Sequence, residues 1–230
     1  MNKLWILLLF AAGIADINCK STSAVDSDKD ENICCIADNW EGLLYLDMGI
    51  VFIDQNTAYS YFNGTVHAAY SFSSKKVFFN ISGLEMSPLI PKPIPDSTLL
   101  LYDFEKMTMY MVPAQGGCTK SSLDSKMERA CVPHGAKETA TGVFGSGNTT
   151  RLLHTYQFST DNDVPYDIRA TIFKNDLTPV HPKVCEPFYV NYFTPSGNPD
   201  SGTMYGLQFM DIGPIKSEKI FDIPEPCLKL

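Results

Sequence analysis

The sequence predicts an all-β fold, built as a sandwich or a barrel. From Cys34 onward, short runs of aromatic and β-branched residues are separated by Gly, Pro, Asn and Ser, a pattern typical of these folds. No long stretch has apolar residues at helical spacing, and only Ser121–Arg129 is a candidate for a minor helix. The chain shows no repeat and no second composition regime, so we expect 34–230 to form a single domain.

The strand candidates fall around short polar turns. We expect strands at 66–72, 76–80, 99–104, 107–112, 152–159, 166–173, 188–193 and 203–212, with hairpin turns at Ser73–Lys75 and Glu105–Lys106. Met107, Met109 and Met111 are expected to share one face of their strand, because side chains alternate with a period of two. Four prolines in 88–95 predict an extended connection or an edge strand.

The N-terminus has the anatomy of a secretory signal peptide, which we place at 1–19. A short positive region precedes an apolar run from Leu4 to Gly13, and small residues then lead to a sharp change of polarity. The run is too short for a resident membrane helix, which needs about 20 apolar residues, and nothing downstream predicts a transmembrane anchor. Residues 20–33 are rich in Ser and Asp and predict a disordered acidic leader.

The cleavage site decides the cysteine count. Cleavage after Ala15 keeps Cys19 and leaves an odd number, which suggests a free thiol or an intermolecular bond. Cleavage after Cys19 leaves an even set that suits internal disulfides, and we favour this second site. Glycosylation sequons at Asn63, Asn80 and Asn148 agree with secretion and place these segments on the surface.

Charge and motifs exclude several classes of function. The net charge of −8 argues against a nucleic-acid partner. No nucleophile elbow, phosphate-binding glycine loop or distinctive carboxylate pair is present, so we expect no catalytic residues and no enzyme activity. The four histidines lack metal-ligand spacing. His154 is expected at a core or rim position, with a pH sensor as the alternative.

Two acidic segments could attract calcium, although no metal ligand can be assigned. Asp26–Asp30 has acidic residues at alternating positions, but Glu31 and Ala37 stand where a calcium loop requires Gly and Glu. A solvated leader is therefore favoured there. Asp161–Asp163 could offer oxygens, but turns also favour Asp and Asn for local reasons. No cofactor is required by these patterns, with Ca²⁺ as the one candidate.

Short elements in order along the chain carry a resemblance to the ependymin-related proteins. They begin with Cys34 followed by Trp40-Glu41-Gly42, and continue through Ala69-Tyr70-Ser71, Lys76-Val77, Leu100-Leu101-Tyr102 and Cys118. Val184-Cys185-Glu186-Pro187 then leads into Phe188–Tyr192, and Leu207–Ile212 runs through Phe221 to Pro226-Cys227. A cysteine that some vertebrate members carry near 88–95 is missing here, and the extra length between Trp40 and Ala69 also departs from the family pattern.

The resemblance implies a secreted or lysosomal glycoprotein that binds hydrophobic molecules. Its fold would be curved antiparallel sheets forming a half-open barrel or sandwich around a deep apolar pocket, similar to bacterial lipoprotein carriers. By position, the resemblance pairs Cys34 with Cys185, Cys118 with Cys227 and Cys35 with Cys131. It also implies a homodimer, and calcium, matrix and adhesion roles are attributed to the family.

Aromatic and methionine side chains on the predicted strands fit such a ligand, since methionine adapts to irregular shapes. The candidate ligand-binding residues are Tyr102, Phe104, Met107, Met109, Met111, Tyr189, Leu207 and Phe209. For each of them, simple core filling is the alternative. The first functional hypothesis is therefore a carrier of lipids or fatty acids. The second is an extracellular matrix or adhesion component associated with calcium or mineral, which the acidic charge and leader favour.

Overall fold

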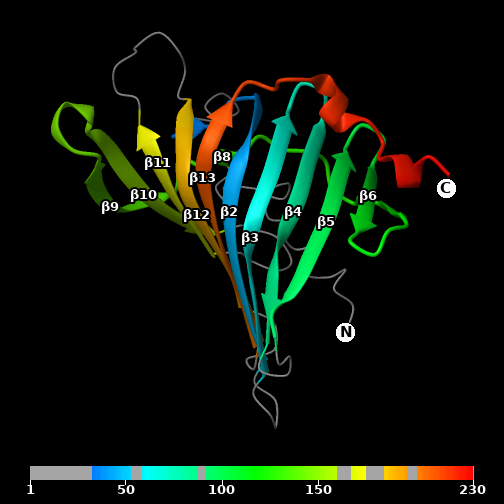
Figure 1. Cartoon of the computed structure of the whole chain (residues 1–230). Coiled ribbons are helices and arrows are strands. Elements are labelled where there is room, and N and C mark those ends of the chain that lie inside the picture. Colours follow the sequence, from blue (N-terminus) through cyan, green and yellow to red (C-terminus); the bar gives the residue numbers. More distant parts are fainter. Residues whose placement is uncertain are drawn as a thin grey trace. The chain divides into compact units, whose positions relative to one another are not determined.

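The computed structural model describes residues 33–52, 58–87, 92–159, 167–174, 184–195 and 201–229. Within these ranges the chain consists mainly of antiparallel β-strands, drawn as arrows in Figure 1, so the all-β prediction is confirmed. The strands belong to two compact units. The small unit comprises the described residues up to Ala37 and Glu128–Thr194, and the large unit comprises Asp38–Met127 and Pro195–Leu230. The predicted signal peptide lies outside the described residues, and the single-domain organisation stays a prediction.

The large unit is an antiparallel run of seven strands in the order β7-β6-β5-β4-β3-β2-β13. Its strands are β2 (Asn39–Phe52), β3 (Ala58–Ser71), β4 (Lys76–Met86), β5 (Ile94–Asp103), β6 (Thr108–Pro113), β7 (Thr119–Ser122) and β13 (Ser201–Gly213). β2 and β3 are the longest and pair without interruption from Asn39–Ser71 to Phe52–Ala58. Figure 1 shows β2 to β5 side by side as a meander, which places residues of consecutive hairpins in register.

Alternation along these strands separates two faces: one is buried along most of its length, and the other is more exposed except where Ala69, Leu101 and Tyr110 pack with Phe221 and Cys227. In β3, Val66, Ala68 and Tyr70 are buried, whereas Thr65 and His67 between them are partly exposed. This is the period-two pattern of a sheet with one face in the core. We call the buried side the core face and the opposite side the outer face. The buried residues of the core face are Trp40, Leu44, Leu46, Ile50, Phe62, Val66, Ala68, Tyr70, Val77, Phe79, Ile81, Thr98, Leu100, Tyr102, Met109, Met111, Tyr205 and Leu207.

Polar side chains at the strand ends fix the two predicted hairpin turns. At the β3–β4 turn, the Ser71 hydroxyl accepts a hydrogen bond from the backbone N–H of Ser74. At the β5–β6 turn, the Asp103 carboxylate accepts one from the backbone N–H of Lys106. Met107 closes the second turn with a φ of 49°. It therefore precedes β6, and the prediction that it shares a strand face with the other two methionines is wrong.

The small unit has its own strands and its own core. β12 (Cys185–Pro195), β11 (Asp167–Lys174), β10 (Arg151–Ser159) and β9 (Lys137–Phe144) lie side by side in this order, and the short strands β1 (Cys34–Cys35) and β8 (Cys131–Val132) form a separate pair. Side chains from both sets pack together. The buried members of this core are Cys34, Val132, Tyr156, Ala170, Ile172 and Cys185.

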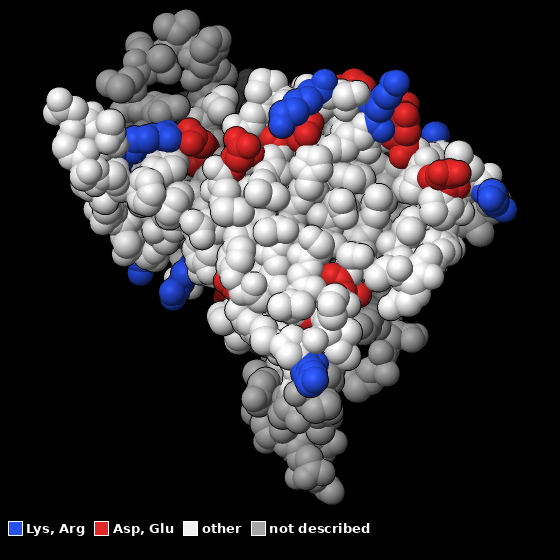
Figure 2. All heavy atoms as spheres, viewed as in Figure 1, with Lys and Arg blue, Asp and Glu red and all other residues white. Residues whose placement is uncertain are grey.

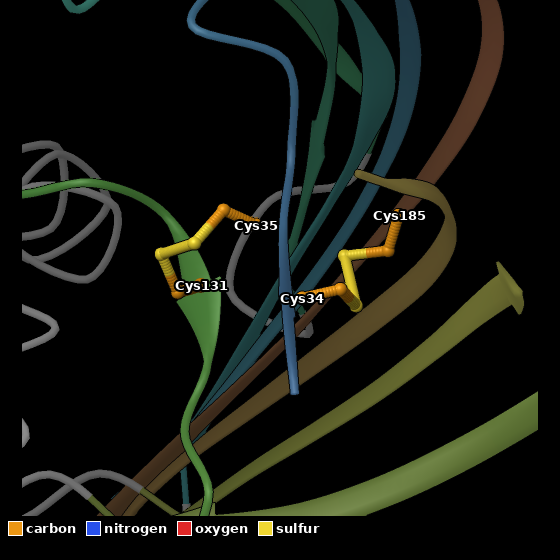
Figure 3. The surroundings of a disulfide bond; sticks show 4 residues. All are labelled: Cys34, Cys35, Cys131 and Cys185. Carbon is orange, nitrogen blue, oxygen red and sulfur yellow. A yellow bond between two sulfur atoms is a disulfide. The ribbon is translucent and has the colours of Figure 1, made fainter. Parts of the chain in front are cut away.

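Two disulfides hold β1 within the small unit. Figure 3 shows the adjacent Cys34 and Cys35 pointing to opposite sides of β1, because neighbouring side chains of a strand alternate. Cys34 is bonded to Cys185 at the start of β12, and Cys35 is bonded to Cys131 of β8. In the large unit, Cys118 is bonded to Cys227. These are the three pairs that the ependymin-related resemblance implies.

The structure differs from the sequence prediction at several elements. Strands β1, β2, β7, β8 and β9 were not predicted, and the predicted helix at Ser121–Arg129 is absent. The start of that segment instead belongs to β7, where Ser122 pairs with Thr108 of β6. The helices in the described chain are short 3₁₀ helices: η1 (Gly147–Thr149), η2 (Glu218–Phe221) and η3 (Glu225–Cys227). None of the described helices is long and apolar enough to cross a membrane.

Candidate functional site

Aromatic side chains concentrate at one end of the core face. Strand pairing places Trp40, Tyr70, Val77, Tyr102 and Met109 in one row across β2 to β6. The Trp40 ring is stacked on Tyr70, with 6.1 Å between the ring centroids. Alternation puts these rings on one side of the strands, and the tight pairing of the meander keeps them in line.

Further rings extend the row on both sides. Phe209 of β13 meets the edge of Trp40 at a centroid distance of 5.9 Å. Tyr102 is stacked on Phe104 at 6.0 Å and meets Phe79 edge to face at 6.2 Å. Such ring contacts contribute about 0.5–1.5 kcal/mol each beyond the burial of their area. This end of the core face is therefore an extended aromatic surface.

Three polar atoms on this part of the core face have no hydrogen-bond partner among the described residues. Two of them, Nε1 of Trp40 and the hydroxyl oxygen of Tyr102, belong to side chains that are only 5% and 2% exposed, and the third is Oγ of Ser121, which pairs with Met109. A buried polar group left unpaired costs about 1–3 kcal/mol, so such groups are uncommon unless something else satisfies them. Burial also raises the pKa of Tyr102 well above its usual range, which keeps its hydroxyl protonated. The Trp40 and Tyr102 groups can therefore both donate a hydrogen bond to a ligand, and this surface is the candidate functional site.

Charged side chains are scarce on the core face. Among the described residues of the seven strands, the pairing register assigns only Glu85 and Asp96 to this side. Asp96 precedes Tyr102 by six residues along β5, which corresponds to roughly 20 Å. The end of the core face that holds Tyr102 and Trp40 thus combines apolar surface with uncharged hydrogen-bond donors.

The structure brings most of the predicted ligand-binding residues to this face. Those on the core face are Tyr102, Met109, Met111, Leu207 and Phe209. Phe104 is buried in the β5–β6 turn against Tyr102, and Met107 lies in the same turn. Tyr189 belongs to β12 of the small unit.

Part of the aromatic surface was not predicted from the sequence. Trp40 served only as a marker of the family resemblance, and Tyr70 only as such a marker and as part of a predicted strand. The period of two along a strand was the signal that could have placed Val77 and Phe79 on one face of β4, and the predicted turn at Ser73–Lys75 could have placed Tyr70 beside Val77. Nothing in the sequence indicates that Trp40 Nε1 and the Tyr102 hydroxyl lack partners.

The outer face of the same strands is mostly uncharged, as Figure 2 shows for the surface over β2 to β5. A polar cluster forms there between β2 and β3. The Tyr61 hydroxyl donates to Asp47 Oδ1 at 2.5 Å, and the side-chain amide of Asn63 donates to the same oxygen at 3.0 Å. The pKa of Tyr61 is raised: the hydrogen bond with Asn63 opposes this, but the Asp47 carboxylate and burial outweigh it.

The three sequons differ in their surroundings. The Asn63 amide nitrogen contacts Asp47 Oδ1 and the hydroxyl oxygens of Tyr45 and Tyr61. Asn80 and Asn148 are exposed. Asn80 lies on the same outer face as Asn63, because their strands are paired in register.

A second outer-face contact ties the C-terminal segment to the strands. Glu41 Oε2 accepts a hydrogen bond from the backbone N–H of Lys216, and Glu41 Oε1 lies 2.9 Å from Nε2 of His67. The backbone N–H of Lys216 is the main cause that lowers the pKa of the Glu41 carboxyl, with His67 contributing and burial opposing. The carboxylate form is therefore the one that holds this contact.

Comparison with models of known protein families and with curated proteins found no match. The ependymin-related assignment accordingly rests on the sequence elements given above and stays a prediction.

Charged groups of the small unit form local pairs. His154 is 8% exposed, which fits the expected core or rim position. Its Nδ1 lies 3.1 Å from Glu138, and its Nε2 has no hydrogen-bond partner in the described part of the chain. Arg151 and Glu186 form two parallel hydrogen bonds of 2.9 and 2.7 Å at the surface. These bonds raise the pKa of Arg151 and lower that of Glu186.

No metal centre emerges from the part of the chain that the structure describes. Within it, no group of three or more His, Cys, Asp or Glu side chains could hold an ion. The two acidic segments that could attract calcium, Asp26–Asp30 and Asp161–Asp163, lie outside the described residues.

Proposed function

We propose that this chain is a secreted glycoprotein that binds hydrophobic molecules, such as lipids or fatty acids, against the aromatic end of its core face. The observation that carries the proposal is the buried hydroxyl of Tyr102, which has no hydrogen-bond partner among the described residues. Its ring packs against Phe79 and Phe104, and Met109 is its partner on β6. An apolar surface with a few unpaired polar groups is what a lipid requires of its binding site. The proposed role is binding rather than catalysis.

The composition of the core face supports a ligand of variable shape. Met109 and Met111 project from β6 beside Tyr102 and Leu100 of β5. Methionine side chains are unbranched and polarizable, so they can adapt to different acyl chains with little strain. Leu207 of β13 supplies a further apolar group on the same face.

The disulfides support an ependymin-related protein of the secretory pathway. The bonds Cys34–Cys185, Cys35–Cys131 and Cys118–Cys227 have the pairing that the resemblance implies. Disulfides persist in oxidising compartments, so extracellular space or the lysosome is the proposed location. A homodimer and N-linked glycans are further parts of this proposal.

A matrix or adhesion role associated with calcium is the second candidate. It is favoured by the net charge of −8 and the acidic sequence of residues 20–33. The two candidates separate cleanly in one assay: a matrix component would sediment with mineral or collagen in calcium and stay soluble in chelator. The sedimentation of a lipid carrier would be the same in calcium and in chelator.

Native mass spectrometry of protein secreted from eukaryotic cells tests the first proposal. The sample is sprayed under native conditions, and the same batch is extracted with organic solvent. A lipid-sized adduct that also appears in the extract is the expected result. A clean apo mass, with no uptake after incubation with fatty acids and phospholipids at pH 5 and pH 7, would contradict the carrier function.

A further inference from the structure

We infer that the Tyr102 hydroxyl anchors an uncharged acceptor oxygen of the ligand, so that the site selects neutral lipids, such as esters, over ionised fatty acids. This inference rests on the proposed function and adds to it the chemical class of the ligand. It follows from the hydrogen bonds that the buried face can make and from the charges that it lacks.

The Tyr102 hydroxyl is the donor. The Tyr102 side chain is 2% exposed, and its hydroxyl has no partner in the described chain. Burial stabilises its protonated form, so the group offers a proton to an acceptor. Carbonyl, ester and alcohol oxygens are acceptors of this kind, whereas a hydrocarbon has none.

The charge of the head group is the second determinant of the ligand class. An ionised carboxylate or phosphate that leaves water is strongly disfavoured unless a cation accompanies it. In the described part of the seven strands, the register puts no Lys or Arg on the core face. None of these strands therefore supplies a cation that would compensate an anionic head group beside Tyr102.

Three lysines in or beside the β3–β4 and β5–β6 turns make other contacts. Lys76 and Lys106 lie 3.9 and 3.5 Å from Asp103, whose side chain is on the other side of β5. The ammonium group of Lys75 lies 3.2 Å from the centroid of the Phe72 ring. These contacts keep the three cations away from a ligand at Tyr102.

Trp40 supplies a second donor on the same row. The strands that carry Trp40 and Tyr102 are three positions apart, which corresponds to about 14 Å. One small head group cannot reach both donors. Trp40 Nε1, which can only donate, is instead placed for a second acceptor oxygen of a longer neutral lipid.

The test uses full-length secreted protein and displacement of the neutral dye Nile red at pH 7.4. The competitors are methyl laurate, laurate and dodecane, which share a chain but differ in the head group. The variant Tyr102→Phe removes only the hydroxyl. The matched control Tyr110→Phe removes a hydroxyl from β6, where Tyr110 pairs with Leu101 on the outer side.

The wild type is expected to bind methyl laurate about tenfold or more tightly than laurate, because the carboxylate finds no partner. Tyr102→Phe should weaken methyl laurate about three- to tenfold, the effect of one neutral hydrogen bond, and leave dodecane unchanged. Tyr110→Phe should leave the affinities for methyl laurate and for dodecane unchanged. Because Tyr102→Phe deletes an unpaired buried group, its apo melting temperature should be unchanged or higher.

Two results would overturn the inference while the proposed function survives. One is equal or tighter binding of laurate relative to its ester, and the other is unchanged ester affinity in Tyr102→Phe, as expected if a buried water satisfies the hydroxyl. If none of the three competitors binds and Nile red is not taken up, the proposed function itself fails, and this inference fails with it.

Discussion

The side-chain amide nitrogen of Asn63 lies 3.0 Å from Oδ1 of Asp47, so a predicted glycosylation site is part of a hydrogen-bonded cluster that joins β3 to β2. Attaching a sugar to that nitrogen would displace the oxygens of Asp47 and Tyr61 that surround it. In the folded protein, the three sequons therefore differ in how readily their asparagine nitrogen can carry a sugar.

Glycans are expected at Asn80 and Asn148, and Asn63 is expected to be unmodified in the secreted, folded pool. Asn80 and Asn148 are exposed, whereas chains with a sugar on Asn63 would lose the cluster and fold poorly. Peptide mapping after enzymatic deglycosylation in heavy-oxygen water measures the occupancy of each site. High occupancy of Asn63 in secreted, disulfide-bonded protein would show that this reasoning is wrong.

Replacing Asp47 by Ala should lower the free energy of unfolding by about 1–3 kcal/mol. The substitution leaves the Tyr61 hydroxyl and the Asn63 amide without their shared acceptor, and hydrogen bonds to charged groups contribute about this much. Urea unfolding followed by circular dichroism measures the change. Asp124→Ala at an exposed position is the control and should be nearly neutral. Equal effects of the two substitutions would contradict the structural role of Asp47.

Acidic pH should release the contact between Glu41 and Lys216. The folded-state pKa of Glu41 is lowered, so its contribution to stability is present above its ordinary pKa and is lost as the pH falls through the folded value. Wild-type stability should therefore decline below about pH 4.5, and Glu41→Gln should be less stable at pH 7 with a flatter decline. Thermal melts from pH 7 to pH 3 test this, with Glu225→Gln at an exposed position as the control. Parallel curves for wild type and Glu41→Gln would refute the assignment.

Removing the Cys118–Cys227 disulfide should strongly destabilise the large unit. The bond closes a loop with a sequence separation of 109 residues, for which chain entropy gives about 4–5 kcal/mol. The double variant Cys118→Ala with Cys227→Ala should unfold at markedly lower urea concentration, or fail to be secreted. A midpoint like that of the wild type would mean that packing around Phe221 and Cys227 holds this segment without the bond.

Much of the fold could be predicted from local pattern, and the exceptions have physical causes. Aromatic and β-branched residues in 66–72 and 76–80, on either side of the polar turn Ser73–Lys75, marked β3 and β4. β9 was not predicted because all its residues are exposed, so its sequence shows no apolar face. In β2, Gly42, Asp47 and Gly49 interrupt an otherwise clear strand signal.

The candidate site was only partly predictable because it depends on neighbours distant in sequence. Methionine and aromatic residues of β5, β6 and β13 were singled out by type, and several of them share the core face. The unpaired state of Tyr102 depends on what surrounds its hydroxyl, which no local pattern records. The disulfide pairs came only from the family resemblance, since cysteine spacing alone leaves many pairings open.

The most direct test of the central claim uses Trp40, which is the one tryptophan outside the predicted signal peptide. Its ring lies on the core face against Tyr70 and Phe209, so a ligand bound there must approach it. Titration with the methyl ester of a dibrominated stearic acid should quench Trp40 fluorescence saturably, while the unbrominated ester should not. Binding of the brominated ester by mass spectrometry without quenching, or no binding at all, would contradict a ligand site on the core face.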